Sequence, residues 1–105
     1  MATVNTGGEK ILPHEVEQVL ARMEGVQSAY VVGVPDMKWG EAVNAVLVME
    51  DGYATPSLSE VRAFAGRYLA RFEVPQRASV VDSLPVSSNG KATVSALRAV
   101  FTHQD

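Results

Sequence analysis

Two apolar runs of strand length, joined by a short connection, constrain the fold more than any other feature of this sequence. Residues 26–34 are rich in β-branched side chains and are followed by Pro35 and Asp36, and residues 41–50 form the second run. Runs of this length and composition are typical of strands. Because so few residues connect them, we expect the two strands to pair antiparallel as a hairpin.

Helical patterns flank this hairpin. Apolar residues recur at helical spacing in three segments, residues 13–23, 58–72 and 94–101. Ser57 and Glu60 have the spacing of a capping box, which marks the start of what we expect to be the longest helix. Pro75 ends that segment, and residues 77–81 have the pattern of a short third strand. The sequence therefore predicts an α+β domain of order α-β-β-α-β-α, in which a small antiparallel or mixed three-stranded sheet is flanked by helices.

Length and composition bound the class of protein. A chain of 105 residues makes one domain with a modest core, and its hydrophobic fraction of 47% and charged fraction of 20% are those of a folded globular protein. A net charge of -3 gives no basic surface for nucleic acid. The absence of cysteine excludes disulfides, thiolate catalysis and cysteine-ligated metals. The longest apolar runs are far shorter than the roughly 20 residues that cross a bilayer, so we expect a cytoplasmic protein with no membrane span.

The segment 84–91, LPVSSNGK, places Lys91 on a turn just ahead of the last helical segment. A compact ammonium on a flexible stem suits a group that must reach a phosphate or carboxylate outside its own domain. The segment is not a phosphate-binding loop of the Walker type, because that pattern needs glycine where Pro85 stands and serine or threonine where Ala92 stands. A lysine beside an Asn-Gly pair is more often a solvated turn residue, and the residues alone leave both interpretations open.

Other candidate residues also allow two interpretations. Gly7 and Gly8 form a flexible loop whose bare backbone N–H groups either approach a ligand or merely let the chain turn. Trp39, at the expected hairpin tip, either caps the sheet edge or contacts a partner. Three arginines lie largely off the apolar face of the second helical segment, namely Arg62, Arg67 and Arg71. They form either a phosphate site or a solvated helix face. His14 has no second ligand nearby, so we expect a surface residue and no metal site.

No complete catalytic constellation is present in the sequence. No histidine is placed to act as a base for a serine nucleophile, and no pair of carboxylates has a spacing that suggests acid–base catalysis. Lys91 has no recognisable catalytic partner in the sequence. The chain therefore has the character of a module that supplies groups to a site completed by another domain.

Several short motifs follow one another at characteristic intervals along almost the whole chain. They are GGE at 7–9, Ile11 with Pro13 and EVE at 15–17, VVGVPD at 31–36, WGE at 39–41, Phe72 with Val74 and Pro75, Leu84 with Pro85, and Gly90 with Lys91. This ordered set resembles the C-terminal domain of the acyl-adenylate-forming enzymes. That superfamily includes acyl-CoA synthetases, the adenylation domains of peptide synthetases and luciferases of the firefly type. The chain departs from the usual family pattern at Lys10, Leu12, Glu73, Ala92, Thr93 and Val94.

The resemblance implies a ligase that acts in two steps. A carboxylate and Mg-ATP give an acyl-adenylate and pyrophosphate, and a thiol such as CoA then displaces AMP. Lys91 matches the family's catalytic lysine, which reaches into the N-terminal domain during the first step. An ammonium held there out of water stabilises the negative charge where carboxylate and triphosphate meet. Gly7, Gly8 and Glu9 match the loop that lines the pantetheine channel after the C-terminal domain rotates.

We therefore expect residues 1–105 to be a single mobile C-terminal domain from an acyl-CoA synthetase of fatty-acid and lipid metabolism, without its hinge and N-terminal domain. ATP, Mg²⁺ and CoA would serve the complete enzyme, and the isolated domain is expected to bind none of them and to be inactive. Its partners would be the N-terminal adenylate-binding domain, an acyl substrate and CoA. Two alternatives are a ligase that transfers acyl groups to the phosphopantetheine of a carrier protein, and a freestanding interaction module without catalysis.

Overall fold

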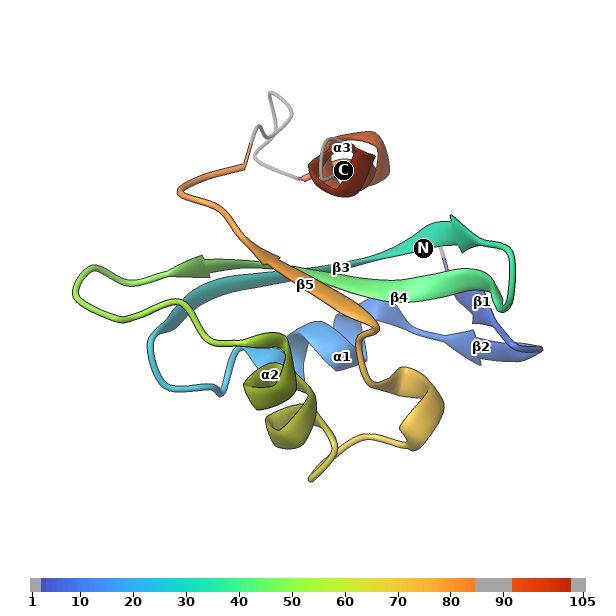
Figure 1. The fold of residues 1–105 in the computed structure, drawn as a ribbon, viewed down its shortest axis with the longest axis horizontal. Coiled ribbons are helices and arrows are strands. Elements are labelled where there is room, and N and C mark those ends of the chain that lie inside the picture. Colours follow the sequence, from blue (N-terminus) through green and yellow to red (C-terminus); the bar gives the residue numbers. More distant parts are fainter. Residues whose placement is uncertain (1–2, 85–91, 103–105) are drawn as a thin grey trace.

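The computed structural model describes residues 3–84 and 92–102, and Figure 1 shows one mixed sheet with helices on both faces. Its elements, in chain order, are β1 (Val4–Thr6), β2 (Glu9–Ile11), α1 (Pro13–Leu20), β3 (Val26–Asp36), β4 (Gly40–Met49), α2 (Leu58–Ala65), the 3₁₀ turn η1 (Arg71–Glu73), β5 (Arg77–Val80) and α3 (Val94–Thr102). The predicted α+β class is confirmed, and so are the central hairpin and the order of the elements from residue 13 onward.

The β3–β4 hairpin forms the centre of the sheet. Its antiparallel register runs from Val26 opposite Met49 to Asp36 opposite Gly40. The other side of β4 pairs with β1, antiparallel, and with β5, parallel, so the sheet is mixed. Because β3 pairs with β4 alone along the sheet path, β3 is an outer strand.

The sheet has more strands than the three predicted. Two additional strands, β1 and β2, pair antiparallel as a hairpin at residues expected to be a flexible loop. Gly7 has φ 55° and Gly8 has φ 86°, and positive φ at both central residues is what the favoured two-residue hairpin turn requires. Each of these strands has three residues, which is too short for an alternating pattern to be visible in the sequence.

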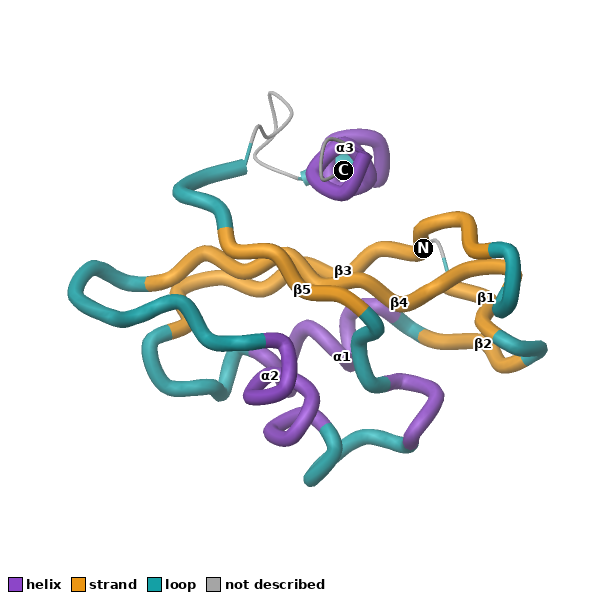
Figure 2. The backbone as a smooth tube through the Cα atoms, viewed as in Figure 1, coloured by secondary structure: helices purple, strands orange, loops and turns teal. Residues whose placement is uncertain are grey.

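Helices lie on both faces of the sheet (Figure 2), and each face has its own hydrophobic cluster. On one face α1 and α2 bury Val16, Leu20, Val61 and Ala65 against the sheet. On the other face α3 buries Leu97 and Phe101 against Val32 and Val46. Among the described residues no helix is long and apolar enough to span a membrane.

The helix α2 is shorter than predicted. The capping box is confirmed, because Ser57 Oγ accepts from the N–H of Glu60 at 3.1 Å and Glu60 Oε1 accepts from the N–H of Ser57 at 2.8 Å. The helix then ends at Ala65, with Gly66 as its cap, instead of continuing to residue 72. Beyond Gly66, Leu69 still packs against the core cluster, whereas Tyr68 and Phe72 continue the apolar spacing but are exposed.

Glu17 of α1 lies against the free edge of β3. Its Oε2 accepts from the backbone N–H of Val31 at 2.8 Å, a group that no neighbouring strand bonds. Burial raises the pKa of the Glu17 carboxyl, while the hydrogen bond from Val31 and the nearby His14 oppose that rise. A helix side chain that occupies a backbone N–H at the edge of an outer strand discourages pairing of that edge with another chain.

Replacing Glu17 with glutamine is expected to remove part of the pH dependence of stability. Because the pKa of Glu17 is raised in the folded state, wild-type stability falls as pH rises from the ordinary glutamate pKa through the raised pKa. The amide stays neutral, so the stability of Glu17→Gln relative to wild type should increase across that window. Urea denaturation at a series of pH values measures this, with Glu15→Gln on the exposed side of α1 as the control for lost charge. A difference that is constant with pH would contradict the prediction.

Candidate functional site

The Gly7–Gly8 turn is held against the tip of the β3–β4 hairpin. The N–H of Gly7 donates to the carbonyl of Trp39 at 2.8 Å. The indole ring also lies against Gly7, because a Cβ at that position would be 3.2 Å from Cε3 of Trp39. The N–H of Gly7 is therefore not bare, as the sequence suggested, but is used to join two turns at one end of the sheet.

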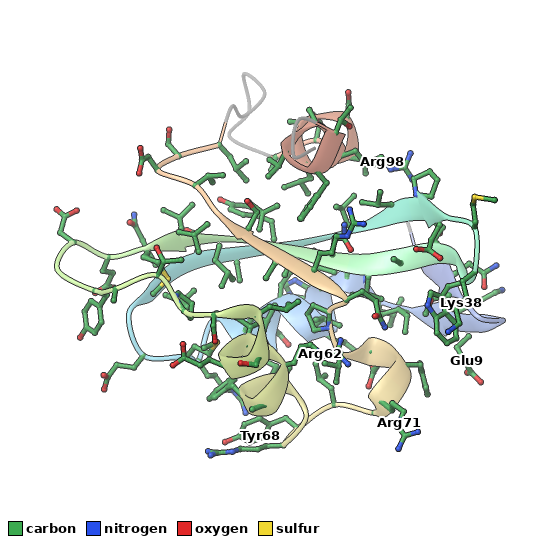
Figure 3. The ribbon with its side chains drawn as sticks, viewed as in Figure 1. Glu9, Lys38, Arg62, Tyr68, Arg71 and Arg98 are labelled. Carbon is green, nitrogen blue, oxygen red and sulfur yellow. The ribbon has the colours of Figure 1, made fainter. Side chains whose placement is uncertain are left out.

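A groove of about 410 Å³ opens beside this turn. Its lining includes Gly7, Glu9, Trp39, Arg62, Arg71 and Phe72. The hairpin, α2 and η1 thus bring together residues that lie far apart in the sequence. Figure 3 shows Glu9 and Lys38 at the hairpin end of the sheet and Arg62 and Arg71 on the side of α2 and η1.

Aromatic faces and guanidinium groups dominate the chemistry of the groove. Trp39 is 40% exposed and Phe72 is 41% exposed, so both rings are accessible. Arg62 is fixed by a 2.6 Å hydrogen bond from Nη1 to the carbonyl of Pro75, whereas Arg71 is exposed. Lys38 does not line the groove but lies next to it, with Nζ 4.9 Å from the centre of the Trp39 ring. Such a lining suits a ligand that combines a flat ring with phosphate groups.

The structure decides between some of the alternatives left open by the sequence. The ring of Trp39 covers Gly7, as a cap would, and it also lines the groove. Contact of Trp39 with a partner stays a prediction. Of the three predicted arginines, Arg62 and Arg71 line the groove and Arg67 does not. Phe72 was placed on the core face of a longer helix and its part in the groove was missed. The signal was Gly66, which ends α2 before that residue.

Comparison with known proteins identifies the family. Residues 15–91 match the sequence profile of the AMP-binding enzyme C-terminal domain. The chain belongs to this family. Over 102 residues this AMP-binding C-terminal domain is 41% identical to a medium/long-chain-fatty-acid–CoA ligase of Mycobacterium tuberculosis, covering 91% of the chain and 18% of the ligase. Over 94 residues it is 40% identical to a fatty acid–acyl-carrier-protein ligase of Streptomyces coeruleorubidus, covering 90% of the chain and 18% of that ligase.

Solved structures agree with this assignment. The AMP-binding C-terminal domain is similar to an amide bond synthetase from Marinactinospora thermotolerans, with a TM-score of 0.87 at 36% identity, covering 94% of this chain and 20% of the synthetase. These comparisons confirm the resemblance predicted from the sequence. The chain spans only 18% of the length of each of the two ligases that it matches.

Lys91, the predicted catalytic residue of this AMP-binding C-terminal domain, lies outside the described residues. The nearest described residues on either side are Leu84 and Ala92, and both pack against the hydrophobic cluster beneath α3. The helix itself begins at a cap in which Oγ1 of Thr93 accepts from the N–H of Ala96 at 3.0 Å. The chain therefore leaves and rejoins the described structure on the α3 face of the sheet.

Metal-ligating side chains do not cluster in the described part of this AMP-binding C-terminal domain, where no group of three or more histidine, aspartate or glutamate residues could hold an ion. His14 lies on the surface of α1, 3.2 Å from the amide nitrogen of Gln18 and 3.7 Å from Glu17. The exposed position of this histidine confirms the interpretation of it as a surface residue.

Substituting Gly7 with alanine is expected to disturb both the turn and Trp39. The positive φ would cost about 1–3 kcal/mol, and the new Cβ would press on the indole ring. Trp39 is the only tryptophan, so its emission spectrum should shift along with the loss of stability. Gly8→Ala is the matched control, because φ is also positive there but a Cβ would meet no heavy atom within 4 Å. Equal changes in emission for the two variants would show that the ring does not rest on Gly7.

Proposed function

We propose that this chain is the mobile C-terminal domain of an acyl-CoA ligase and works only with an N-terminal adenylate-binding domain. The observation that carries the proposal is the Gly7–Gly8 turn beside a groove of aromatic and guanidinium groups, in a domain of the AMP-binding family. The chain covers 18% of the length of each related ligase, and the proposal assigns the acyl pocket to the N-terminal domain. Under this proposal the isolated domain has no activity of its own.

In the first half-reaction the proposed role of this domain is to supply Lys91. ATP, bound with Mg²⁺ by the N-terminal domain, provides the phosphoanhydride that activates the carboxylate. Lys91 places an ammonium beside the carboxylate oxygen and the α-phosphate, where negative charge concentrates as the two anions meet. A lysine suits this role because its charge is compact and its stem can extend from a small scaffold.

In the second half-reaction the proposed contact is with CoA. The pantetheine arm passes the Gly7–Gly8 turn, where a side chain would narrow the approach of the thiol. The nucleotide end of CoA lies in the groove, with its adenine against Trp39 or Phe72 and its phosphates near Arg71. Support comes from the accessible rings and cations on the lining of that groove.

The two roles belong to different surfaces of the domain, which supports rotation between the half-reactions. Leu84 and Ala92 lie under α3 on one face of the sheet, whereas the groove lies between the β1–β2 turn and the α2 side of the sheet. A rotation that withdraws one surface and presents the other gives each step its own site.

A carrier protein is the alternative acceptor. One related enzyme is a fatty acid–acyl-carrier-protein ligase and a similar structure is an amide bond synthetase, so the family serves more than one kind of acceptor. Comparing CoA with a carrier protein bearing phosphopantetheine, at equal concentrations in a transfer assay with the complete ligase, separates the two possibilities.

Replacing Lys91 with alanine in the complete ligase should abolish the first half-reaction selectively. Loss of one charged group that stabilises a developing anion lowers the rate roughly a hundredfold or more. ATP–pyrophosphate exchange measures this step, and transfer from a supplied acyl-adenylate to CoA measures the second step, which should change little. Lys10→Ala, at an exposed position of β2, is the matched control. Unchanged pyrophosphate exchange in Lys91→Ala would refute the role given to this lysine.

Replacing Trp39 with alanine should weaken the use of CoA. Stacking of a base on an aromatic side chain is worth about 1–3 kcal/mol, so KM for CoA should rise roughly fivefold to a hundredfold while pyrophosphate exchange is retained. The exposed aromatic Tyr68, outside the groove, gives the control variant Tyr68→Ala.

Pantetheine, which lacks the nucleotide, distinguishes stacking from a distorted turn. With pantetheine as the thiol, Trp39→Ala and wild type should behave alike. An equal loss with both thiols would mean that Trp39 acts by supporting Gly7 and not by binding the nucleotide.

A further inference from the structure

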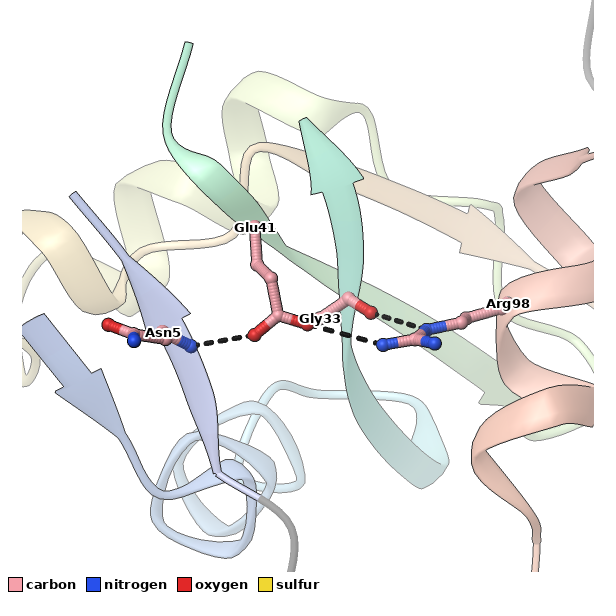
Figure 4. Close-up of polar contacts among 4 residues, drawn as sticks. All are labelled: Asn5, Gly33, Glu41 and Arg98. Carbon is pink, nitrogen blue, oxygen red and sulfur yellow. Dashed lines mark hydrogen bonds and ion pairs between the residues drawn. The ribbon is translucent and has the colours of Figure 1, made fainter. Parts of the chain in front are cut away.

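The carboxylate of Glu41 joins several elements of the fold (Figure 4). Its Oε1 accepts from the backbone N–H of Asn5 in β1 at 2.8 Å. Its Oε2 accepts from Nη2 of Arg98 in α3 at 3.2 Å. Arg98 also donates from Nε to the carbonyl of Gly33 in β3 at 2.8 Å. A single side chain of β4 thus contacts the strand that leads into the Gly7–Gly8 turn and the helix that follows Lys91.

The bond from Asn5 lies where β1 has little backbone pairing with β4. The register between these strands contains one pair, Thr6 opposite Gly40, and the N–H of Gly7 donates to the carbonyl of Trp39. Two residues before Gly7, the N–H of Asn5 bonds to the side chain of Glu41. The carboxylate therefore extends the attachment of β1 to β4 beyond the backbone ladder.

Gly33 leaves room for this carboxylate. A Cβ at that position would lie 2.9 Å from Oε2 of Glu41 and 3.0 Å from Cγ1 of Val4. The first distance is below any ordinary contact, so a larger residue would displace Glu41 or the strand. Arg98 then limits the remaining freedom of the carboxylate, since its guanidinium is itself anchored on the carbonyl of Gly33.

We propose that Glu41 is a positioning residue for the Gly7–Gly8 turn and that Arg98 of α3 holds Glu41 in place. The inference rests on the proposed function, in which that turn serves the thiol step. Through Glu41 and Arg98, the helix α3 that follows Lys91 is therefore coupled to the Gly7–Gly8 turn, which the proposed function assigns to the second half-reaction. A change at Arg98 alters the thiol step although Arg98 lines neither the turn nor its groove.

The first test uses the chain itself and needs no enzyme activity. Amide hydrogen exchange, measured by NMR, should accelerate at Asn5 about tenfold in Glu41→Ala, which loses a charged acceptor. In Arg98→Met the expected acceleration is about two- to fivefold, because the ion pair is partly exposed. The exchange of Val80 in β5 should change in neither variant. Arg67→Met, at an exposed arginine outside the groove, controls for the lost charge.

Two further variants separate the parts of the contact. Glu41→Gln keeps an oxygen for Asn5 but loses the charge that attracts Arg98, so its effect should resemble that of Arg98→Met. Gly33→Ala should reproduce Glu41→Ala by displacing the carboxylate. Unchanged exchange at Asn5 in Arg98→Met, or an equal increase at Val80, would overturn the tie between α3 and the turn.

The second test uses the complete ligase and distinguishes this inference from the proposed function. Glu41→Ala and Arg98→Met should raise KM for CoA several-fold with pyrophosphate exchange retained, and Arg98→Lys should restore part of the loss. If Gly7→Ala impairs transfer to CoA and the Glu41 and Arg98 variants do not, the inference fails and the proposed function stands. If none of the three impairs transfer, the proposed role of the turn fails.

Discussion

The structure depends on β4, a strand that pairs with three others and is buried on both faces. Residues 42–47 are all buried, and β3, β1 and β5 bond to the two edges of this strand. A strand without a solvent face needs a packed layer on each side. On one side the layer is α1 with α2, and on the other it is α3 (Figure 2). The burial of β4 therefore fixes α3 and, directly before it, the point where the chain returns from Lys91.

Local patterns in the sequence were sufficient to predict much of this arrangement. The β3–β4 hairpin, the capping box at Ser57 and the amphipathic α3 each depend on residues that lie close together in the chain. The β1–β2 hairpin was missed because its strands are too short to show alternation. The predicted length of α2 was wrong because Phe72 has helical spacing but lies on the surface beside the groove, and hydrophobicity alone could not distinguish a core side chain from an exposed one.

The sequence allowed individual residues of the candidate site to be predicted, but not their arrangement in space. Gly7, Trp39 and Arg71 were each recognised as unusual, but they come together because β1 returns to β4 and η1 follows α2 beneath the sheet. Contacts between such distant segments have no signature in the spacing of residues. The role of Lys91 came from the family resemblance and stays a prediction, because this residue lies outside the described part of the chain.

The chemistry of the groove also bears on the acceptor under the proposed function. A carrier protein delivers its thiol on phosphopantetheine, which has one phosphate and no base, so it would leave both exposed rings of the groove without a stacking partner. CoA carries an adenine and additional phosphates on the same arm. Trp39 and Phe72 lie beside Arg71 in one lining, and rings next to a guanidinium match a nucleotide better than the bare arm. Under the proposed function, the lining of the groove is therefore an argument for CoA over a carrier protein as the acceptor.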